Sequence, residues 1–272
     1  INREDNPDYT SPPGVNPERD RSKPDEEVYG NEQSLNLILT DLEQNEKREA
    51  VKYLFRPLDV FNYSEMKLFI HGDETGNSIS GANGRYRAEV YFRFGGDTNN
   101  YYEYRQPVDT GWNEISILFS ELTAIKQARI RTDSVASLGV NGSPGHSYQI
   151  LGNPTLTGIK FLTVGIVNIS DTSNPGAISG EVWVNELRVI GADDTPGFAY
   201  SISTSFKMAD LMTVSFNMSQ TSPYFHRLAD RFGSRVESKN WSVNTDLNVL
   251  KLLPINLPES NLRLTYSHTE SV

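Results

Sequence analysis

A two-residue alternation between large apolar and small polar side chains over residues 198–272 constrains the fold of this chain more than any other feature. Four runs show it, and the first reads FAYSISTSFKM from Phe198. Successive side chains of a strand point to opposite faces, and a tilted strand of ~9 to 11 residues crosses a bilayer. The small phase is rich in Ser, Thr and Asn rather than in the Lys and Glu usual on a solvated face. The pattern predicts about four strands of an outer-membrane β-barrel.

Each predicted barrel strand has one face for lipid and one for the lumen. The residues expected to face lipid are Phe198, Ile202, Phe206, Val214, Phe216, Trp241 and Leu264. The residues expected to face the lumen are Ala199, Ser201, Ser203, Asn244, Asp246 and Arg263. A soluble sheet with one wet face shows the same alternation and is the alternative. Because a barrel needs about eight strands, the chain, which begins at Ile1, is interpreted as a fragment.

The connections between these runs are expected to alternate in length. They are short at 209–210, long over 219–240 and shorter again over 253–260. Barrels of this class have short periplasmic turns and long external loops. By that rule Phe198 enters the membrane from outside, and the residues before it are predicted to be extracellular.

Residues 33–192 show the shorter alternations of a soluble β-sandwich. Strands are predicted at 35–40, 66–70, 86–94, 101–108, 113–119, 148–151, 159–169 and 182–190. Turn signals such as GGDTNN and NGSPGH separate them. One helix is predicted over Glu121–Arg129, with Ser120 as its N-cap. The predicted fold class is all-β: an antiparallel, jelly-roll-like sandwich followed by barrel strands.

Residues 1–32 have the composition of an acidic, Pro-rich linker. They hold five prolines and nine acidic against four basic residues. Such a segment buries too little apolar surface to offset its ordering entropy, so we expect it to be extended and ordered only by contact with something larger. The formal net charge of −10 argues against a general nucleic-acid binder.

Chemical motifs are sparse, and we predict no enzyme, catalytic residue, metal or cofactor. The four histidines, His71, His146, His226 and His268, do not lie at metal-ligand spacing. Calcium could bind at Asp193–Asp194 or in HGDETGNS, but solvated turns are favoured. Glu103 and Glu114 have no sequence feature that supports a glycosidase pair.

Three tyrosines suggest an alternative function for the sandwich. Tyr101, Tyr102 and Tyr104, with Tyr91 and Trp112 nearby in sequence, could form a stacking platform for a sugar. The chain would then be a carbohydrate-binding surface module. Cross-strand packing of these rings is the favoured interpretation of the same pattern.

Several segments together resemble the SprA family, also called Sov. NEQSLNLILTDL and VKYLFRPLDVFNYSEMKLFIHG are similar to the family's repeated sandwich segment. GEVWVNELRVIGADDTPGFAYSISTSFKMADLMTVSFNMS resembles its passage from a sandwich into barrel strands. LNVLKLLPINLPESNLRLTYSHT resembles its strand–FLP–strand element, here with Leu252–Leu253–Pro254, and YTSPPGVNPERD fits its Pro-rich approach. The resemblance runs from about Tyr9 nearly to the end of the chain.

The resemblance implies a role that composition alone does not supply. Members of the family are giant outer-membrane translocons of the type 9 secretion system in Bacteroidetes, and they support gliding motility in some species. The implied partners are secreted cargo proteins, a PorV-type shuttle protein, a plug protein and outer-membrane lipid, with no nucleic acid. The family has no catalytic residues to carry over.

Overall fold

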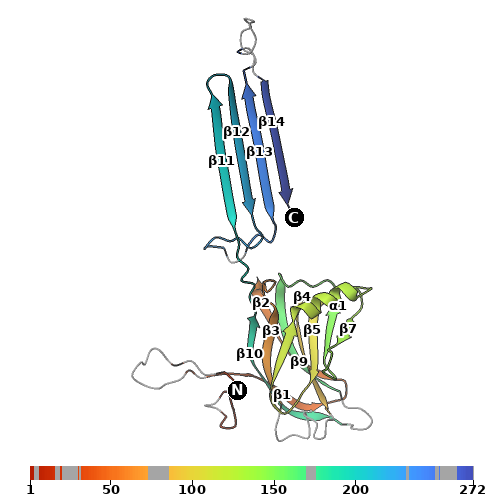
Figure 1. Cartoon of the computed structure of the whole chain (residues 1–272). Coiled ribbons are helices and arrows are strands. Elements are labelled where there is room, and N and C mark those ends of the chain that lie inside the picture. The colour runs from red at the N-terminus through yellow and green to blue at the C-terminus, as the bar shows by residue number, and fades with distance from the viewer. Residues whose placement is uncertain are drawn as a thin grey trace. The chain divides into compact units, whose positions relative to one another are not determined.

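The chain folds into two compact units, residues 1–193 and residues 194–272 (Figure 1). The computed structural model describes residues 1–2, 6–15, 19, 30, 32–72, 86–169, 176–230, 233–248, 251 and 262–271. In this part of the chain the regular structure is antiparallel β-sheet with one helix. The predicted all-β class is therefore confirmed. No helix among these residues is long and apolar enough to cross a membrane.

The first unit is built from two antiparallel sheets. The four-stranded sheet has the order β1 (Leu35–Leu42), β10 (Ile178–Ile190), β3 (Glu65–Gly72) and β6 (Gly111–Leu118). The six-stranded sheet has the order β2 (Lys47–Leu58), β9 (Ile159–Asn168), β4 (Ala88–Asp97), β5 (Asn100–Pro107), β8 (Ser147–Leu151) and β7 (Ala136–Gly139). Most neighbours in space are distant in sequence, so each sheet ties together both ends of the unit.

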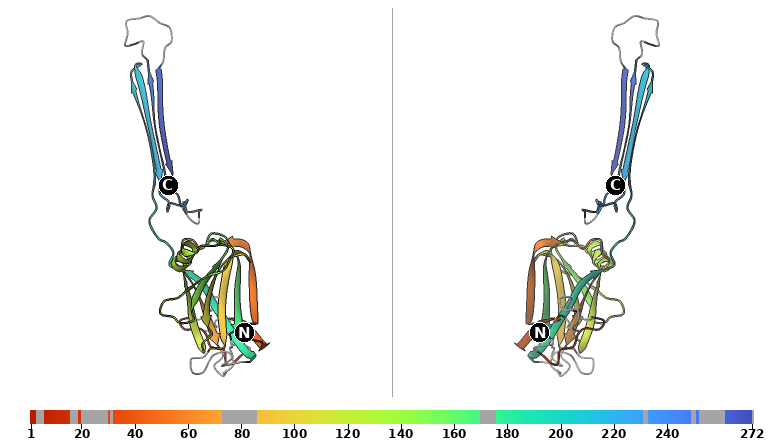
Figure 2. Two further views of the ribbon diagram at one scale, coloured as in Figure 1. Left: turned by 90° about the vertical axis from the view of Figure 1, so that its right-hand side faces the viewer. Right: turned by 90° about the vertical axis from the view of Figure 1, so that its left-hand side faces the viewer.

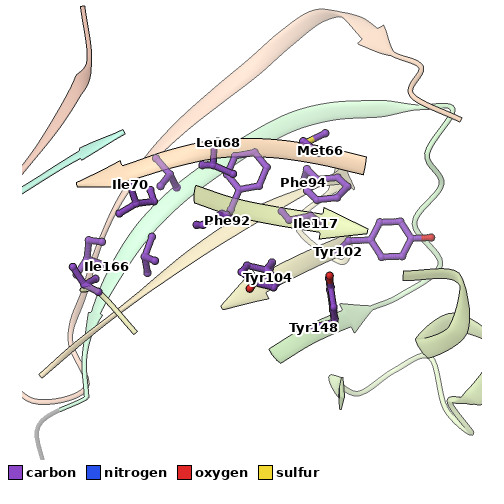
Figure 3. Close-up of a cluster of buried hydrophobic side chains, with 14 of the residues drawn as sticks. Met66, Leu68, Ile70, Phe92, Phe94, Tyr102, Tyr104, Ile117, Tyr148 and Ile166 are labelled. Atoms are coloured by element: carbon purple, nitrogen blue, oxygen red, sulfur yellow. The ribbon is translucent and has the colours of Figure 1, made fainter. Parts of the chain in front are cut away.

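Apolar side chains from both sheets form a shared core (Figure 3). Met66, Leu68 and Ile70 supply one side of it from β3, where each is about 1% exposed. Phe92 and Phe94 of β4 supply the other side. Because burying a side chain of this size contributes about 1.5–3 kcal/mol, the paired apolar faces are the main source of stability.

Every predicted strand overlaps an observed one, but two observed strands were not predicted. In β2 the residues Val51, Tyr53 and Phe55 are exposed although they are apolar, so the strand has no clean alternation. The other missed strand, β7, is only four residues long.

The helix α1 (Phe119–Ala128) begins earlier than predicted because the chain passes from β6 directly into it. Its N-cap is Leu118, which forms no side-chain capping bond, so the prediction that Ser120 caps the helix is wrong. Phe119, Leu122 and Ile125 are buried and attach α1 to the core.

Some residues of the acidic segment 1–32, which we call the leader, are held in place by the chain's own sandwich and need no larger partner. Asn2 forms a β-bridge with Gln33, and the Ser34 N–H donates to the carbonyl oxygen of Ile1 over 2.9 Å. Tyr9 is 2% exposed and packs on the four-stranded sheet. The contact expected from something larger is thus partly supplied by the chain's own sandwich.

The second unit contains a four-stranded antiparallel sheet with the simplest order, in which each strand pairs with the next (Figure 2). Its strands are β11 (Ala199–Met208), β12 (Met212–Thr221), β13 (Ser238–Leu247) and β14 (Leu262–Ser271). The connections between them comprise residues 209–211, 222–237 and 248–261. The third connection is therefore nearly as long as the second, and the expected alternation in length is weaker than the sequence indicated.

Candidate functional site

The sheet β11–β14 has two chemically different faces because its register is unbroken. The β11–β12 pairs run from Ala199 opposite Thr221 to Met208 opposite Met212, and the next two ladders continue without a shift. Residues directly opposite each other in an antiparallel pair share a face. Each row of four residues across the sheet therefore belongs to one face.

One face carries large apolar side chains in successive rows. The rows include Ile202–Met218–Trp241–His268, Thr204–Phe216–Val243–Tyr266, Phe206–Val214–Thr245–Leu264 and Met208–Met212–Leu247–Leu262. Phe206 is 70% exposed and Leu264 is 59% exposed. Contiguous exposed apolar surface of this kind marks a binding or membrane surface in a protein.

The opposite face carries small polar side chains that hydrogen-bond across the strands. Ser203 Oγ donates to Asn217 Oδ1 over 2.7 Å, and the hydroxyls of Ser205 and Ser215 are 3.2 Å apart. The side chains are short, so they project little from the sheet. This face suits water or polar protein rather than lipid.

The two ends of the sheet differ as well, which the sequence reasoning missed. Near one end of the apolar face, the rings of Trp241 and Tyr266 are 5.0 Å apart and those of Trp241 and His268 are 5.9 Å apart. At the β11–β12 turn end, the polar face has a charged row with Lys207, Asp246 and Arg263. Arg263 Nε donates to Asp246 Oδ1 over 2.7 Å. The sequence did contain a signal for this charged row, because Lys207 lies in the small polar phase of the first run.

The strand register places the two sets of residues that we assigned to lumen and lipid on opposite faces. Ala199, Ser201, Ser203, Asn244, Asp246 and Arg263 share the polar face. Ile202, Phe206, Val214, Phe216, Trp241 and Leu264 share the apolar face, and Phe198 precedes β11 in the same phase. Which surroundings each face meets stays a prediction.

The three tyrosines of the sugar-binding alternative do not share a face. Tyr102 and Tyr104 are buried in the sandwich core, where Tyr104 lies 5.2 Å from Tyr148 and Tyr102 lies 5.8 Å from Phe94. Tyr101 precedes Tyr102 in β5 and therefore points the other way. Tyr102 and Tyr104 therefore pack across the strands, and the three rings do not form one platform.

The outer face of the six-stranded sheet holds a charged network around a buried ring. Tyr91 is 0% exposed, and the guanidinium carbons of Arg93 and Arg105 each lie 5.3 Å from its ring centroid. The Tyr91 hydroxyl donates to Glu49 Oε2. Burial and this carboxylate raise the pKa of Tyr91, while the bond from Tyr91 is the main cause that lowers the pKa of Glu49.

The two carboxylates considered as a glycosidase pair belong to separate ion-pair groups. Glu103 is 1% exposed and accepts from Arg93 Nε over 2.6 Å and from Arg105 Nε over 2.5 Å. Glu114 lies in the other sheet and accepts from Lys67 over 3.0 Å and from Arg188 over 2.9 Å. Although burial acts to raise it, these two cations hold the pKa of Glu114 below its usual value. Both carboxylates act as structural acceptors.

The histidines lie in four different settings. His71 stacks on Trp183 at 4.3 Å, and His146 Nδ1 is 2.8 Å from the Tyr104 hydroxyl. His226 Nδ1 is 3.1 Å from its neighbour's carbonyl at position 224, and His268 lies beside Trp241. Among the described residues, no group of three His, Asp or Glu side chains could hold a metal ion.

The two calcium alternatives receive no supporting geometry. Asp193 and Asp194 are exposed in the segment that follows β10. Most of the HGDETGNS cluster, from Asp73 onward, lies outside the described residues.

A comparison with protein families finds a match over nearly the whole chain. The family SprA_N, described as motility related/secretion protein, matches residues 1–111 and 111–269. The chain belongs to this family. The family's description connects the family with motility and secretion. The match includes both the sandwich and the amphipathic sheet. No significant match was found among curated proteins.

Proposed function

We propose that this chain is part of an outer-membrane protein-secretion translocon of the type 9 secretion system, which in some Bacteroidetes also serves gliding motility. Residues 198–272 supply strands of the barrel wall. Residues 33–192 form a jelly-roll-like insert or cap on the extracellular side. The observation that carries the proposal is the unshifted register of β11–β14, which keeps four successive, mostly apolar and exposed rows on one face and mostly small polar side chains on the other. Membership of a motility and secretion family supports it.

The proposed mechanism follows from how a sheet survives in lipid. Backbone N–H and C=O groups must be paired in the bilayer core, so a spanning sheet has to close on itself. In the described part of the chain, β11 and β14 each pair on one side only. Further strands would pair with both edges, and the small residues of the polar face would leave the lumen wide enough for folded cargo. The wall needs no catalytic residue, cofactor or nucleic acid.

The partners follow from the same proposal. Secreted cargo would meet the polar face, outer-membrane lipid would meet the apolar face, and a PorV-type shuttle and a plug protein would bind around the pore. The short turn at residues 209–211 supports a periplasmic end there. Leu247 and Leu262, which the 14-residue connection 248–261 joins, lie at the same end of the sheet as that first turn, so the orientation depends mainly on the short turn.

Paired cysteine labelling in intact cells tests the membrane assignment. The chain has no cysteine, so each introduced thiol reports one position. Ser205→Cys and Phe206→Cys place thiols on opposite faces at neighbouring positions, and Ser215→Cys and Phe216→Cys form a matched second pair. A small water-soluble maleimide should label the serine positions at least about tenfold faster, because the reactive thiolate does not form in lipid.

Equal labelling within both pairs would count against a barrel wall and favour a soluble sheet. Faster labelling at the phenylalanine positions would reverse the assigned faces. The carbohydrate-binding alternative has lost its shared tyrosine face, and it would return only if the sandwich bound glycans and lost that binding on Tyr101→Ala.

A further inference from the structure

Three rings on the outer face of the four-stranded sheet form a row that is directly paired across the strands. His71 of β3 lies opposite both Trp112 of β6 and Trp183 of β10. His71 and Trp183 are stacked with their centroids 4.3 Å apart, and Trp112 lies 5.0 Å from His71 at a steep angle. A row of this kind on a bare sheet face would expose a large apolar surface to water.

Tyr9 of the leader covers this row. Its ring lies 5.5 Å from Trp183 and 6.4 Å from Trp112, where it packs edge to face. Its exposed fraction is only 2%, and Trp183 and His71 are 8% and 6% exposed. We call the site formed by Trp112, His71 and Trp183, together with Ser34 and Asn185, the Tyr9 pocket.

The Tyr9 pocket also hydrogen-bonds to the phenol hydroxyl of Tyr9. The Tyr9 hydroxyl lies 2.7 Å from Ser34 Oγ and 3.2 Å from Asn185 Nδ2. It donates to Glu32 Oε1 over 3.1 Å, and Asn185 Nδ2 donates to the same oxygen over 2.6 Å. A phenylalanine in this place would fill the ring site and leave these polar groups without the hydroxyl.

The Tyr9 pocket also contacts the backbone next to Tyr9, so the contact is more than the packing of one side chain. Trp112 Nε1 donates to the main-chain carbonyl of Thr10 over 2.8 Å. Ser11 Oγ donates to Glu32, and Pro12 is buried. Pro7 and Pro13 lie in two turns that flank the tyrosine, closed by hydrogen bonds from Tyr9 N–H to the Asn6 carbonyl and from Val15 N–H to the Pro12 carbonyl, each over 3.1 Å. Proline fixes its own φ, so ordering these turns costs less conformational entropy.

We propose that the Tyr9 pocket is a recognition site for a tyrosine-centred peptide with a proline turn on each side of the tyrosine, and that residues 6–15 of this chain are its exchangeable occupant. The segment is held in the pocket by ring stacking, a phenol network and one hydrogen bond to its backbone, and the chain itself is its only covalent connection to the sheet. The same peptide therefore binds from solution once the chain's own tyrosine is removed. This proposal is independent of the membrane assignment of residues 198–272.

Peptide binding to the full chain tests the proposal. The probe is a dye-labelled peptide NPDYTSPPGV, which corresponds to residues 6–15, and its fluorescence anisotropy is measured. We expect Tyr9→Ala to bind it at least tenfold more tightly than the unmodified chain, in which the attached segment competes. A peptide with Phe in place of Tyr should bind Tyr9→Ala about tenfold more weakly, since it lacks the hydroxyl. Adding Trp183→Ala should abolish binding.

Tyr9→Phe keeps the ring and protects the experiment against a folding defect in Tyr9→Ala. Its own segment should compete less well than the native one, so the order of peptide affinity is unmodified chain, then Tyr9→Phe, then Tyr9→Ala as the tightest. An absence of this order would show that Tyr9 is a fixed part of the core, and equal binding with and without Trp183→Ala would show that the peptide binds outside the pocket. Either result would overturn the proposal.

Discussion

Adding one methyl group at Gly165 should destabilise the sandwich by about 3 kcal/mol. Gly165 of β9 lies directly opposite Tyr91 of β4. A Cβ atom built on Gly165 would lie 2.7 Å from Tyr91 Cε1 and closer still to Cζ and the hydroxyl. Gly165 has an ordinary backbone conformation, so alanine itself is not strained there. The cost comes from the ring that occupies the space.

The magnitude follows from what surrounds the ring. Tyr91 is fully buried and two guanidinium groups lie near its ring, so the ring cannot swing aside freely, and overpacking of this kind costs about 2 kcal/mol. Tilting the ring also weakens its bond to Glu49, which we take as about 1.5 kcal/mol because that side chain is 33% exposed. Replacing glycine by alanine in a strand returns about 0.5 kcal/mol.

A double-mutant cycle separates the ring from other causes. Urea unfolding is followed by tryptophan emission in a Trp241→Phe background, so that the signal comes from the sandwich alone. Gly165→Ala should cost about 3 kcal/mol by itself and should stabilise by about 0.5 kcal/mol in Tyr91→Ala. Gly158→Ala is the matched control, because a Cβ there meets only ordinary contacts. An equal loss with and without Tyr91 would refute the reasoning.

Three further predictions concern α1, acid sensitivity and the amphipathic sheet. Leu118→Ser places a capping residue three positions before Glu121, and it should raise the unfolding free energy by about 1 kcal/mol in the same urea assay. Burial lowers the pKa of His146, so the stability that its neutral form contributes is present above the unfolded pKa of about 6.5 and is lost as pH falls through the folded value. His146→Gln should therefore flatten the fall in stability between about pH 6.5 and 5, and an unchanged slope would contradict this. Phe216→Arg should cost about 2–4 kcal/mol near the bilayer midplane and reduce the protein recovered in outer membranes, whereas Asn217→Arg should be tolerated; equal recovery would contradict the lipid assignment.

Most of the strands and faces that could be predicted from the sequence followed from local periodicity. In β11–β14 one phase is mostly apolar and the other mostly polar, so both the strands and their faces followed from the sequence. The opposite directions of Tyr101 and Tyr102 also follow from the sequence, because adjacent residues of a strand point to opposite faces. Ser120 was chosen as a cap for its residue type, while the β6–α1 junction decided the position.

The features that the sequence did not predict depend on contacts between residues far apart in the chain, which leave no local pattern. Tyr9 lies in a Pro-rich acidic segment without periodicity, and its partners Trp112 and Trp183 are more than 100 residues away in the sequence. The Tyr91 network likewise depends on four strands meeting in one register. Composition indicated that residues 1–32 could not fold alone, but it could not identify the surface that receives them.

The unshifted ladders of β11–β14 also restrict which insertions and deletions this sheet can accept during evolution. In the sandwich, β1 and β10 absorb irregularities at their register shifts, where Asp41 and Glu186 have positive φ angles. The ladders between β11 and β14 have no such place. Removal of one residue from the middle of β12 would exchange inner and outer side chains for the rest of that strand. Viable insertions and deletions within these strands should therefore occur in pairs of residues, while the connections between them remain free to vary by any number.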